Sequence, residues 1–332
     1  MPQQRDLFID FLKGLCIISV VLTHNLPEAV MKASVFVLWG AMAVPLFLTL
    51  QSYHVFHRGM RPDKKLKDYY PWRKIWHRIL KPFALITLAT GAILVIAGHD
   101  PIATIKGAVI SGGIGPGSYY VWIYLQFALL LPICLTLFNK MGGGISTCLL
   151  FILISQGVEW LCIYIDIPEP VYRLTCLRYL FLIYLGYLWT TNRMSKSITS
   201  KQICLSLLSA LALIALYYST GSLKPFLHDT AWRSFHWICY FWVALMLPWL
   251  IWKLFDKLPP VIKNMVGEVG QWSYEIFLLQ MLVFTVYPHR LLDTGNSYIN
   301  IAMYIIFTTC ASIIPVIVYK RWRINRNVLA SK

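Results

Sequence analysis

Residues 7–24 read LFIDFLKGLCIISVVLTH, an apolar stretch that is interrupted by Asp10 and Lys13 and ends in His24. Its length is close to what an α-helix needs to cross about 30 Å of hydrocarbon. Later runs such as 203–218 and 299–319 are equally apolar and lack the polar–apolar alternation of barrel strands. The sequence therefore predicts an all-α membrane protein.

Composition supports this class, because 58% of residues are hydrophobic and only 13% are charged. The prediction is a polytopic protein in which residues 1–332 form one integral membrane domain. About ten transmembrane helices are expected, at 7–25, 34–54, 82–98, 119–138, 145–165, 174–191, 203–219, 235–254, 272–288 and 299–319.

The distribution of Lys and Arg predicts the orientation. With both termini cytoplasmic, 23 of the 30 basic residues fall on the inner side, in agreement with the positive-inside rule. The net charge of +16 then reflects topology, and no loop is long enough to form a nucleic-acid-binding domain. No signal-peptide cleavage site is evident, so the first span is expected to remain as an anchor.

Lys13 and His24 lie eleven residues apart in the first predicted helix. Eleven residues bring an α-helix back to within about 20° of its starting face and advance it by about 16 Å. The spacing predicts a cation near one membrane surface and an imidazole deeper on the same face, as in a functional site. The alternative is that Lys13 extends to the lipid head groups and His24 is an interfacial residue.

Residues 58–81, RGMRPDKKLKDYYPWRKIWHRILK, combine nine cations with four aromatic rings. Such a segment is typical of an anchor at a lipid surface. The alternative is a site for a polyanionic ligand, because Arg73, Lys74, Arg78 and Lys81 recur at helical spacing and could converge on phosphates.

Other motifs give no evidence for a metal or phosphate-loop site. The eight cysteines have wide, irregular spacing and are expected to be packing residues, and His54 and His57 form no metalloprotease pattern. No metal is expected. The glycine clusters at 112–117 and 142–144 are expected to form turns.

Residues 5–24 resemble the opening of acyltransferase family 3, in which an Asp precedes a Lys-Gly or Arg-Gly pair and a His follows the cation after ten residues. Asp10, Lys13, Gly14 and His24 occupy these positions. Further stretches resemble the second, third, fourth and ninth spans of the family, namely VPLFLTLQSY (44–53), RILKPF (78–83), GSYYVWIYLQFALLLP (117–132) and SYEIFLLQ (273–280).

The resemblance implies a bacterial enzyme of the cytoplasmic membrane that transfers an acyl group, usually acetyl, from cytoplasmic acyl-CoA to a hydroxyl of a glycan. Its partners would be acetyl-CoA as donor, a glycan acceptor and the lipid bilayer. Lys13 and the cations at 73–81 would hold the phosphates of coenzyme A. His24 would act as general base or carry the acyl group transiently.

Two positions depart from the family pattern. The usual Arg-x-x-Arg before the third span is absent, so Lys74 or Lys81 would supply the second cation beside Arg78. Gln280 stands where the ninth span often carries His, and it is expected to line the site as a polar residue.

Further polar residues are expected to support the site. Glu159 and Arg178 are predicted to form an ion pair between the fifth and sixth spans, with a structural role favoured. Glu28 is a candidate to orient the His24 imidazole, although Pro27 disturbs the helix between them. Asp10 and Gln126 complete the supporting set.

Two other functions are compatible with the sequence. A glycan or lipid-linked saccharide exporter would also need many spans and basic inner loops, but it would be expected to contain internal repeats, and none is evident. A catalytically inactive scaffold of the same family is disfavoured because His24 is retained.

Overall fold

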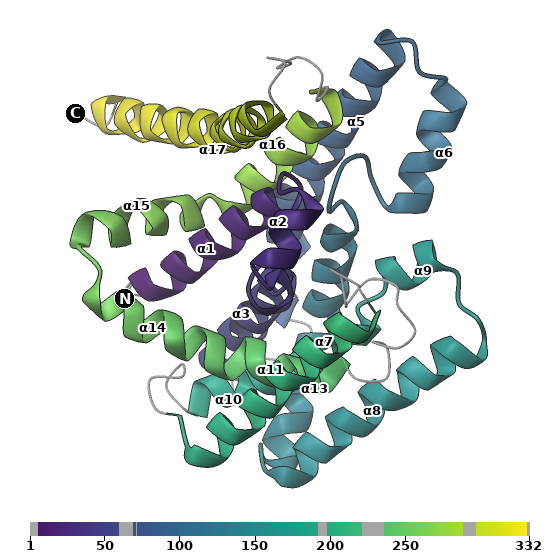
Figure 1. Ribbon diagram of the computed structural model, residues 1–332, viewed down its shortest axis with the longest axis vertical. Helices are drawn as coiled ribbons and strands as arrows, with labels where there is room; N and C mark the ends of the chain where they lie inside the picture. Colours follow the sequence, from purple (N-terminus) through teal and green to yellow (C-terminus); the bar gives the residue numbers. More distant parts are fainter. Residues whose placement is uncertain are drawn as a thin grey trace.

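The structure is a computed structural model, and it describes residues 6–59, 69–70, 72–191, 198–220, 236–287 and 297–330. Within these ranges the regular structure is entirely helical (Figure 1). The α-helices are α1 (Leu7–Thr23), α2 (Glu28–Ala33), α3 (Ala43–Arg58), α4 (Trp72–Ile75), α5 (Lys81–Ile96), α6 (Pro101–Ser111), α7 (Tyr119–Met141), α8 (Ile145–Tyr164), α9 (Glu169–Leu174), α10 (Phe181–Thr191), α11 (Ser200–Thr220), α13 (His236–Phe241), α14 (Leu247–Lys257), α15 (Pro260–Gln271), α16 (Ser273–Val286) and α17 (Ser297–Ala330). Short 3₁₀ and π turns are η1 (Phe36–Leu38), η3 (Trp76–Leu80), η4 (Leu177–Tyr179) and η5 (Trp242–Met246).

The predicted all-α fold class is confirmed for the described residues, and each of the ten predicted segments contains helix. In the part of the chain that the structure describes, seven helical segments are long and apolar enough to cross a membrane: Phe36–Arg58, Trp72–Ile96, Tyr119–Met141, Ile145–Tyr164, Ser200–Ser219, Trp237–Lys257 and Tyr298–Arg323. The remaining predicted spans correspond to α1, α16 and the η4–α10 segment, which are shorter. The count of ten therefore stays a prediction.

Within the described residues, four short helices besides α4, which leads into the third predicted span, lie outside the predicted spans: α2, α6, α9 and α15. Three of them have Pro in the first turn, where its missing N–H costs no hydrogen bond. Asp100 also caps α6 by accepting a hydrogen bond from Ala103 N at 2.6 Å. None of the four gives a span-length apolar run, which is why the hydropathy pattern placed them in loops.

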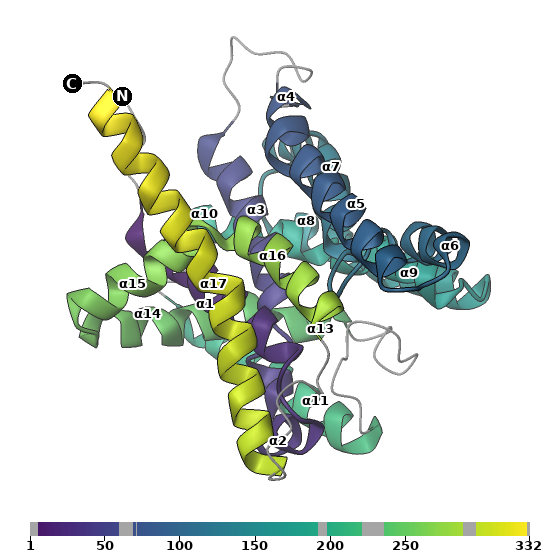
Figure 2. The ribbon, with the colours of Figure 1, turned by 90° about the horizontal axis from the view of Figure 1, so that it is seen from above.

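Helix α3 lies at the centre of the molecule and packs closely against α10 and α7 (Figure 2). Gly186 of α10 permits this contact, because a Cβ there would overlap Ser52 and stand 2.9 Å from the Thr49 carbonyl oxygen. One large hydrophobic core surrounds α3, α7 and α10, and a second core joins α1, α5 and α16. The long α17 runs past α16 and α1 along one side.

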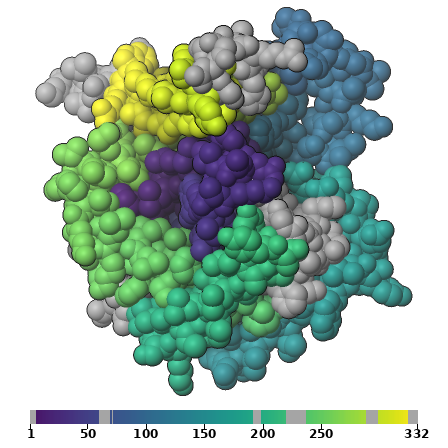
Figure 3. Space-filling view, in the orientation of Figure 1, coloured from purple at the N-terminus to yellow at the C-terminus, as the bar shows by residue number. Residues whose placement is uncertain are grey.

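Helix α1 is fixed mainly by α15, its closest neighbour. Gly14 of α1 and Gly267 and Gly270 of α15 face the opposing helix, and a Cβ at any of them would overlap it. In the space-filling view the purple N-terminal segment is bordered by the green α14–α15 region and the yellow α17 (Figure 3). Since α1 carries both Lys13 and His24, this packing sets the position of the candidate site.

Candidate active-site cavity

A cavity of about 1660 Å³ lies between α1, α3, α7 and α16, with the turn η3 and the 112–117 loop closing its sides. Lys13 and His24 both line it. Both residues thus face one cavity, and about 16 Å of helix axis separates them within it. We call the two regions the basic end, around Lys13, and the His24 end.

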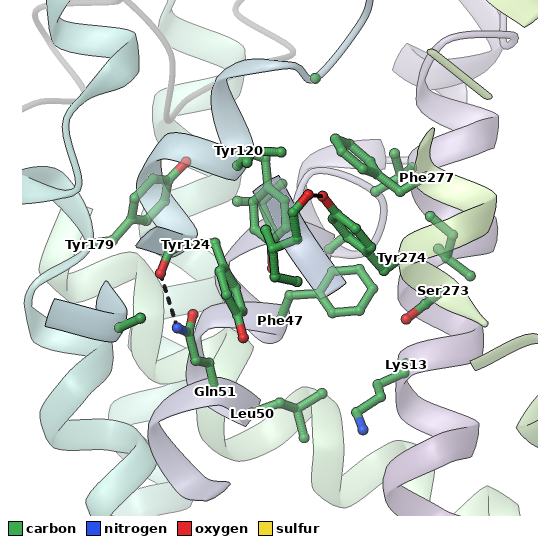
Figure 4. Close-up of a pocket in the computed structure, with 18 of the residues that line it drawn as sticks. Lys13, Phe47, Leu50, Gln51, Tyr120, Tyr124, Tyr179, Ser273, Tyr274 and Phe277 are labelled. Atoms are coloured by element: carbon green, nitrogen blue, oxygen red, sulfur yellow. Dashed lines mark hydrogen bonds between the residues drawn. The ribbon is translucent and has the colours of Figure 1, made fainter. Parts of the chain in front are cut away.

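The basic end collects five nitrogen-bearing side chains from three helical segments. Lys13 comes from α1, His54 and Arg58 come from α3, and Lys74 and Arg78 come from the helix that leads into α5. Arg58, Lys74 and Arg78 are exposed, so this end is accessible from outside the protein. Figure 4 places the Lys13 amine beside Leu50 at the bottom of the cavity. Asp10 lies 3.7 Å from the Lys13 Nζ and is itself buried.

The structure brings Lys74 and Arg78 to the cavity but leaves Arg73 and Lys81 exposed and outside its lining. The predicted convergence of all four cations is wrong for these two. For Lys81 the reason is the π turn η3, which holds one residue more than an α turn and shifts everything after it by about 100°. Arg73 precedes this turn and points about 100° away from its neighbour Lys74 on the same helix. In an uninterrupted helix Lys81 would share the face of Lys74. The rest of the basic segment, residues 60–68 and 71, lies outside the described residues.

Sequence reasoning missed His54 and Arg58 as lining residues. Gln51, His54, Val55 and Arg58 all line the cavity at the i, i+3, i+4, i+7 spacing of one helix face. That spacing is present in the sequence and indicates that these four side chains share one helix face. The described residues contain no group of three or more His, Cys, Asp or Glu side chains that could hold a metal ion.

His24 ends helix α1 and is half-buried. Its backbone N–H donates to the Val21 carbonyl at 3.2 Å, and its ring lies 5.7 Å from the ring of Phe284. Pro116 and Gly117 also belong to the lining of the cavity. They come from the predicted glycine turn, in which Gly112, Gly113, Gly115 and Gly117 all have positive φ.

Gln280 is fully buried and is absent from the cavity lining, so its predicted role as a lining residue is wrong. Its Nε2 donates to the carbonyl of Pro116 at 3.1 Å. Gly115 adds a second contact to the same helix, because a Cβ there would stand 2.8 Å from the Met281 carbonyl oxygen. Gln280 thus positions the loop that lines the cavity.

Glu28 begins a separate helix, α2, and its carboxylate pairs with Lys32 at 2.5 Å. The hydrogen bond and charge of Lys32 lower the pKa of Glu28, and Glu28 raises the pKa of Lys32. Glu28 is exposed and outside the cavity lining. The proposed orienting contact with His24 is therefore replaced by an ion pair along α2.

Glu159 and Arg178 are both buried, and both contact Tyr172. The Tyr172 hydroxyl donates to Glu159 at 2.9 Å, and the Arg178 guanidinium carbon lies 5.2 Å from the Tyr172 ring centroid. This common contact fits the structural role that the sequence favoured. The direct ion pair stays a prediction.

Gln126 has a structural role at the end of α9. Its Nε2 donates to the Leu174 carbonyl at 2.6 Å, and its Oε1 accepts from the Cys176 N–H at 2.9 Å. It holds the turn between α9 and η4 and does not line the cavity. Arg173, which precedes this turn, does line it, with its guanidinium 5.5 Å from the ring of Tyr119.

The middle of the cavity is aromatic. Phe47, Tyr120, Tyr274 and Phe277 come from α3, α7 and α16 and point toward one another above Lys13 (Figure 4). The Tyr274 hydroxyl donates to the Ile79 carbonyl at 2.7 Å and so fixes α16 to the π turn. The cavity therefore has a basic end, an aromatic middle and an imidazole at the other end.

Comparison with known families agrees with this architecture. A family model described as an acyltransferase domain matches residues 6–320, nearly the whole chain. This match and the apolar helices define a membrane acyltransferase, and the chain belongs to acyltransferase family 3. No curated protein and no solved structure matches it.

Proposed function

We propose that this protein transfers an acetyl group from cytoplasmic acyl-CoA to a hydroxyl of a cell-surface or exported glycan. The observation that carries the proposal is the shared cavity, whose described lining includes the cations Lys13, Arg58, Lys74 and Arg78 together with His54 and His24. A group of cations suits a polyanionic donor, and an imidazole suits proton transfer near neutral pH.

Acyl-CoA fits the distance between the two ends. About 16 Å of helix axis separates Lys13 from His24, so the ligand must carry its phosphates far from its reactive atom. Coenzyme A does so, because the pantetheine arm extends from the phosphates to the thioester. The phosphates would contact the basic end, and the thioester would lie beside His24.

His24 is proposed as the general base. Its imidazole accepts the proton of the acceptor hydroxyl while the hydroxyl oxygen attacks the carbonyl carbon of the thioester. A C–O bond forms, the C–S bond breaks, and the departing thiolate takes the proton from the imidazolium. In a second version of the proposal, an imidazole nitrogen accepts the acyl group before passing it to the hydroxyl.

The orientation follows from charge. We place the protein in the bacterial cytoplasmic membrane with ten spans and both termini in the cytoplasm, because 23 of the 30 Lys and Arg residues then lie on the inner side. The basic end would then face the cytoplasm, where acyl-CoA is available. The His24 end would face the acceptor on the outer side.

The test is mass spectrometry of surface glycans from cells with the gene, without it, and with the His24→Ala variant. We expect one acyl mass per modified sugar only with the wild-type gene. A glycan that reaches the surface in equal amount but without the acyl group in the deletion strain supports transfer over export. Identical acylation in all three strains would refute the proposal.

A further inference from the structure

A band of apolar and aromatic side chains lines the cavity between its two ends. It consists of Val20 from α1, Phe47 from α3, Tyr120 from α7, and Tyr274 and Phe277 from α16, and we call it the collar. The rings contact one another in sequence along the wall: the centroid of Tyr120 lies 6.1 Å from that of Phe47 and 5.7 Å from that of Phe277. Phe277 in turn stacks on Tyr274 at 6.2 Å.

The collar lies on the path between the basic end and His24. Along α1, Val20 is about 10 Å beyond Lys13 and about 6 Å before His24, at 1.5 Å per residue. Figure 4 likewise places Phe47, Tyr120 and Phe277 above Lys13 and Leu50. A ligand that holds its phosphates at the basic end must therefore extend past the collar to bring its reactive group to His24.

The collar is held in place from both sides. Val20, Phe47 and Tyr120 each pack against both hydrophobic cores, so they form the junction between the α3–α7–α10 core and the α1–α5–α16 core. Close-packed side chains resist displacement, because moving one of them disturbs contacts in both cores. The collar side chains are therefore held in fixed positions by the fold.

The collar is also uncharged. Its cavity-lining neighbours on α1 and α3, Ile17 and Val44, are aliphatic, and the cations of the described lining lie at the basic end or, as Arg173, beside Tyr119. A carboxylate beside the collar loses hydration without gaining a cationic partner from it, and it lies against the negative faces of the aromatic rings.

We propose that the collar selects the acyl group of the donor, admitting small, unbranched, uncharged groups and rejecting branched or carboxylated ones. This inference rests on the proposed function and adds its donor specificity. Acetyl and propionyl groups would pass with the pantetheine arm. An isobutyryl group would be rejected by its width and a succinyl group by its charge.

The test measures release of coenzyme A by the purified full-length protein with acceptor glycan and four donors: acetyl-, propionyl-, isobutyryl- and succinyl-CoA. We expect kcat/KM for isobutyryl- and succinyl-CoA to be at least about tenfold below that for acetyl-CoA, as steric rejection by a packed site typically gives. Phe47→Ala and Phe277→Ala should raise the isobutyryl-to-acetyl ratio by about tenfold. The succinyl-to-acetyl ratio should rise less, since a wider passage is still uncharged.

Phe83→Ala is the matched control. Phe83 is buried in the same core as Phe277 but does not line the cavity, so its truncation should cost stability without changing the donor ratios. Where an alanine variant fails to fold, Phe47→Leu and Phe277→Leu provide the same comparison with less loss of packing.

The outcomes separate the two proposals. If the wild-type protein transfers no acyl group from any donor, the proposed function fails and the collar proposal falls with it. If acetyl transfer occurs but isobutyryl and succinyl donors react equally well, or if the collar variants keep the wild-type ratios, the collar proposal alone is overturned.

Discussion

Gly270 of α15 lies directly against the backbone of Asp10 in α1, so closely that a Cβ at position 270 would overlap the Asp10 carbonyl oxygen. The contact joins two backbones, and neither can move aside as a flexible side chain could. Because Asp10 is one turn from Lys13, the separation of these helices sets where the Lys13 amine enters the cavity.

Gly270→Ala is expected to push α15 away from α1. Overpacking of this kind typically costs about 1–3 kcal/mol, which outweighs the gain in helix propensity from alanine. Thermal unfolding in detergent should show a lower midpoint, and acyl transfer should fall. Gly107→Ala is the matched control, because Gly107 is an exposed helical glycine with nothing within 4 Å of its Cβ position. Equal midpoints for the two variants would contradict the role of the contact.

Lys13→Ala and Arg78→Ala are expected to weaken acetyl-CoA binding in nanodiscs. Charge-assisted hydrogen bonds contribute about 1.5–3 kcal/mol each, which corresponds to about 10- to 100-fold in Kd. Added salt should weaken wild-type binding too, since Arg78 is exposed. Lys81→Ala is the control, because the π turn directs Lys81 away from the cavity. An equal loss of affinity in the Lys81 and Arg78 variants would refute the assignment of the basic end.

His24→Ala is expected to abolish acyl transfer while leaving insertion and donor affinity unchanged. His24 lies about 16 Å along α1 from Lys13, beyond the collar, so it should not contact the phosphates. The control is His57→Ala, whose ring stacks on Tyr53 at 5.2 Å and lies outside the cavity lining. Wild-type transfer in the His24 variant would exclude both catalytic roles proposed for the imidazole.

The sequence predicted the elements that depend on long apolar runs and the shared face of Lys13 and His24. Both follow from helix geometry alone, since the length of a run and the angle between two residues of one helix need no tertiary contact. The close packing of α1 on α15 could not be predicted in this way. It depends on Gly14 and Gly270 meeting across two helices that are far apart in the chain.

The candidate site was predicted in part, and each wrong prediction about its residues has a specific structural cause. Lys81 was misplaced because a π turn changes the helical phase, and Pro82, which follows the turn, marks a disturbed helix without specifying that change of phase. Gln280 was wrongly expected in the lining, because its hydrogen bond to Pro116 joins residues 164 positions apart and leaves no local signal in the sequence. The collar was missed because aromatic residues in an apolar span look like ordinary packing until the three helices that carry them are placed together.

Stability should depend on pH through the ion pair that joins α15 to α17. Arg321 donates to Glu268 through its Nε at 2.6 Å, and this contact lowers the pKa of Glu268. A carboxyl group whose pKa is lowered on folding contributes stability above its unfolded pKa and loses it as the pH falls through the folded value. The unfolding midpoint should therefore fall on acidification below the ordinary carboxyl range.

Glu268→Gln separates this effect from general acid unfolding. The amide cannot titrate, so the variant should be less stable than wild type at neutral pH and should approach it as the pH falls. The comparison is a series of thermal unfolding scans across the acidic range. A constant difference between the two proteins at every pH would assign the acid sensitivity to other groups.

The basic end can bind acyl-CoA only if it faces the cytoplasm. The segment 58–81 carries nine basic residues, and the opposite orientation would require them to cross the membrane against the positive-inside bias. We expect the 58–81 loop to be cytoplasmic and the 220–236 loop to be external. The most informative positions, 66 and 222, lie outside the described residues, so their labelling tests the topology independently of the structure.

The measurement is labelling of single cysteines by a membrane-impermeant reagent in intact cells, with all eight native cysteines replaced. Ser222→Cys should react from outside, whereas Leu66→Cys should react only after the membrane is permeabilised. Retained acyl transfer in the cysteine-free protein controls for folding. Labelling of position 66 but not of position 222 in intact cells would place the basic end outside the cell, where no acyl-CoA is available, and would refute the proposed direction of transfer.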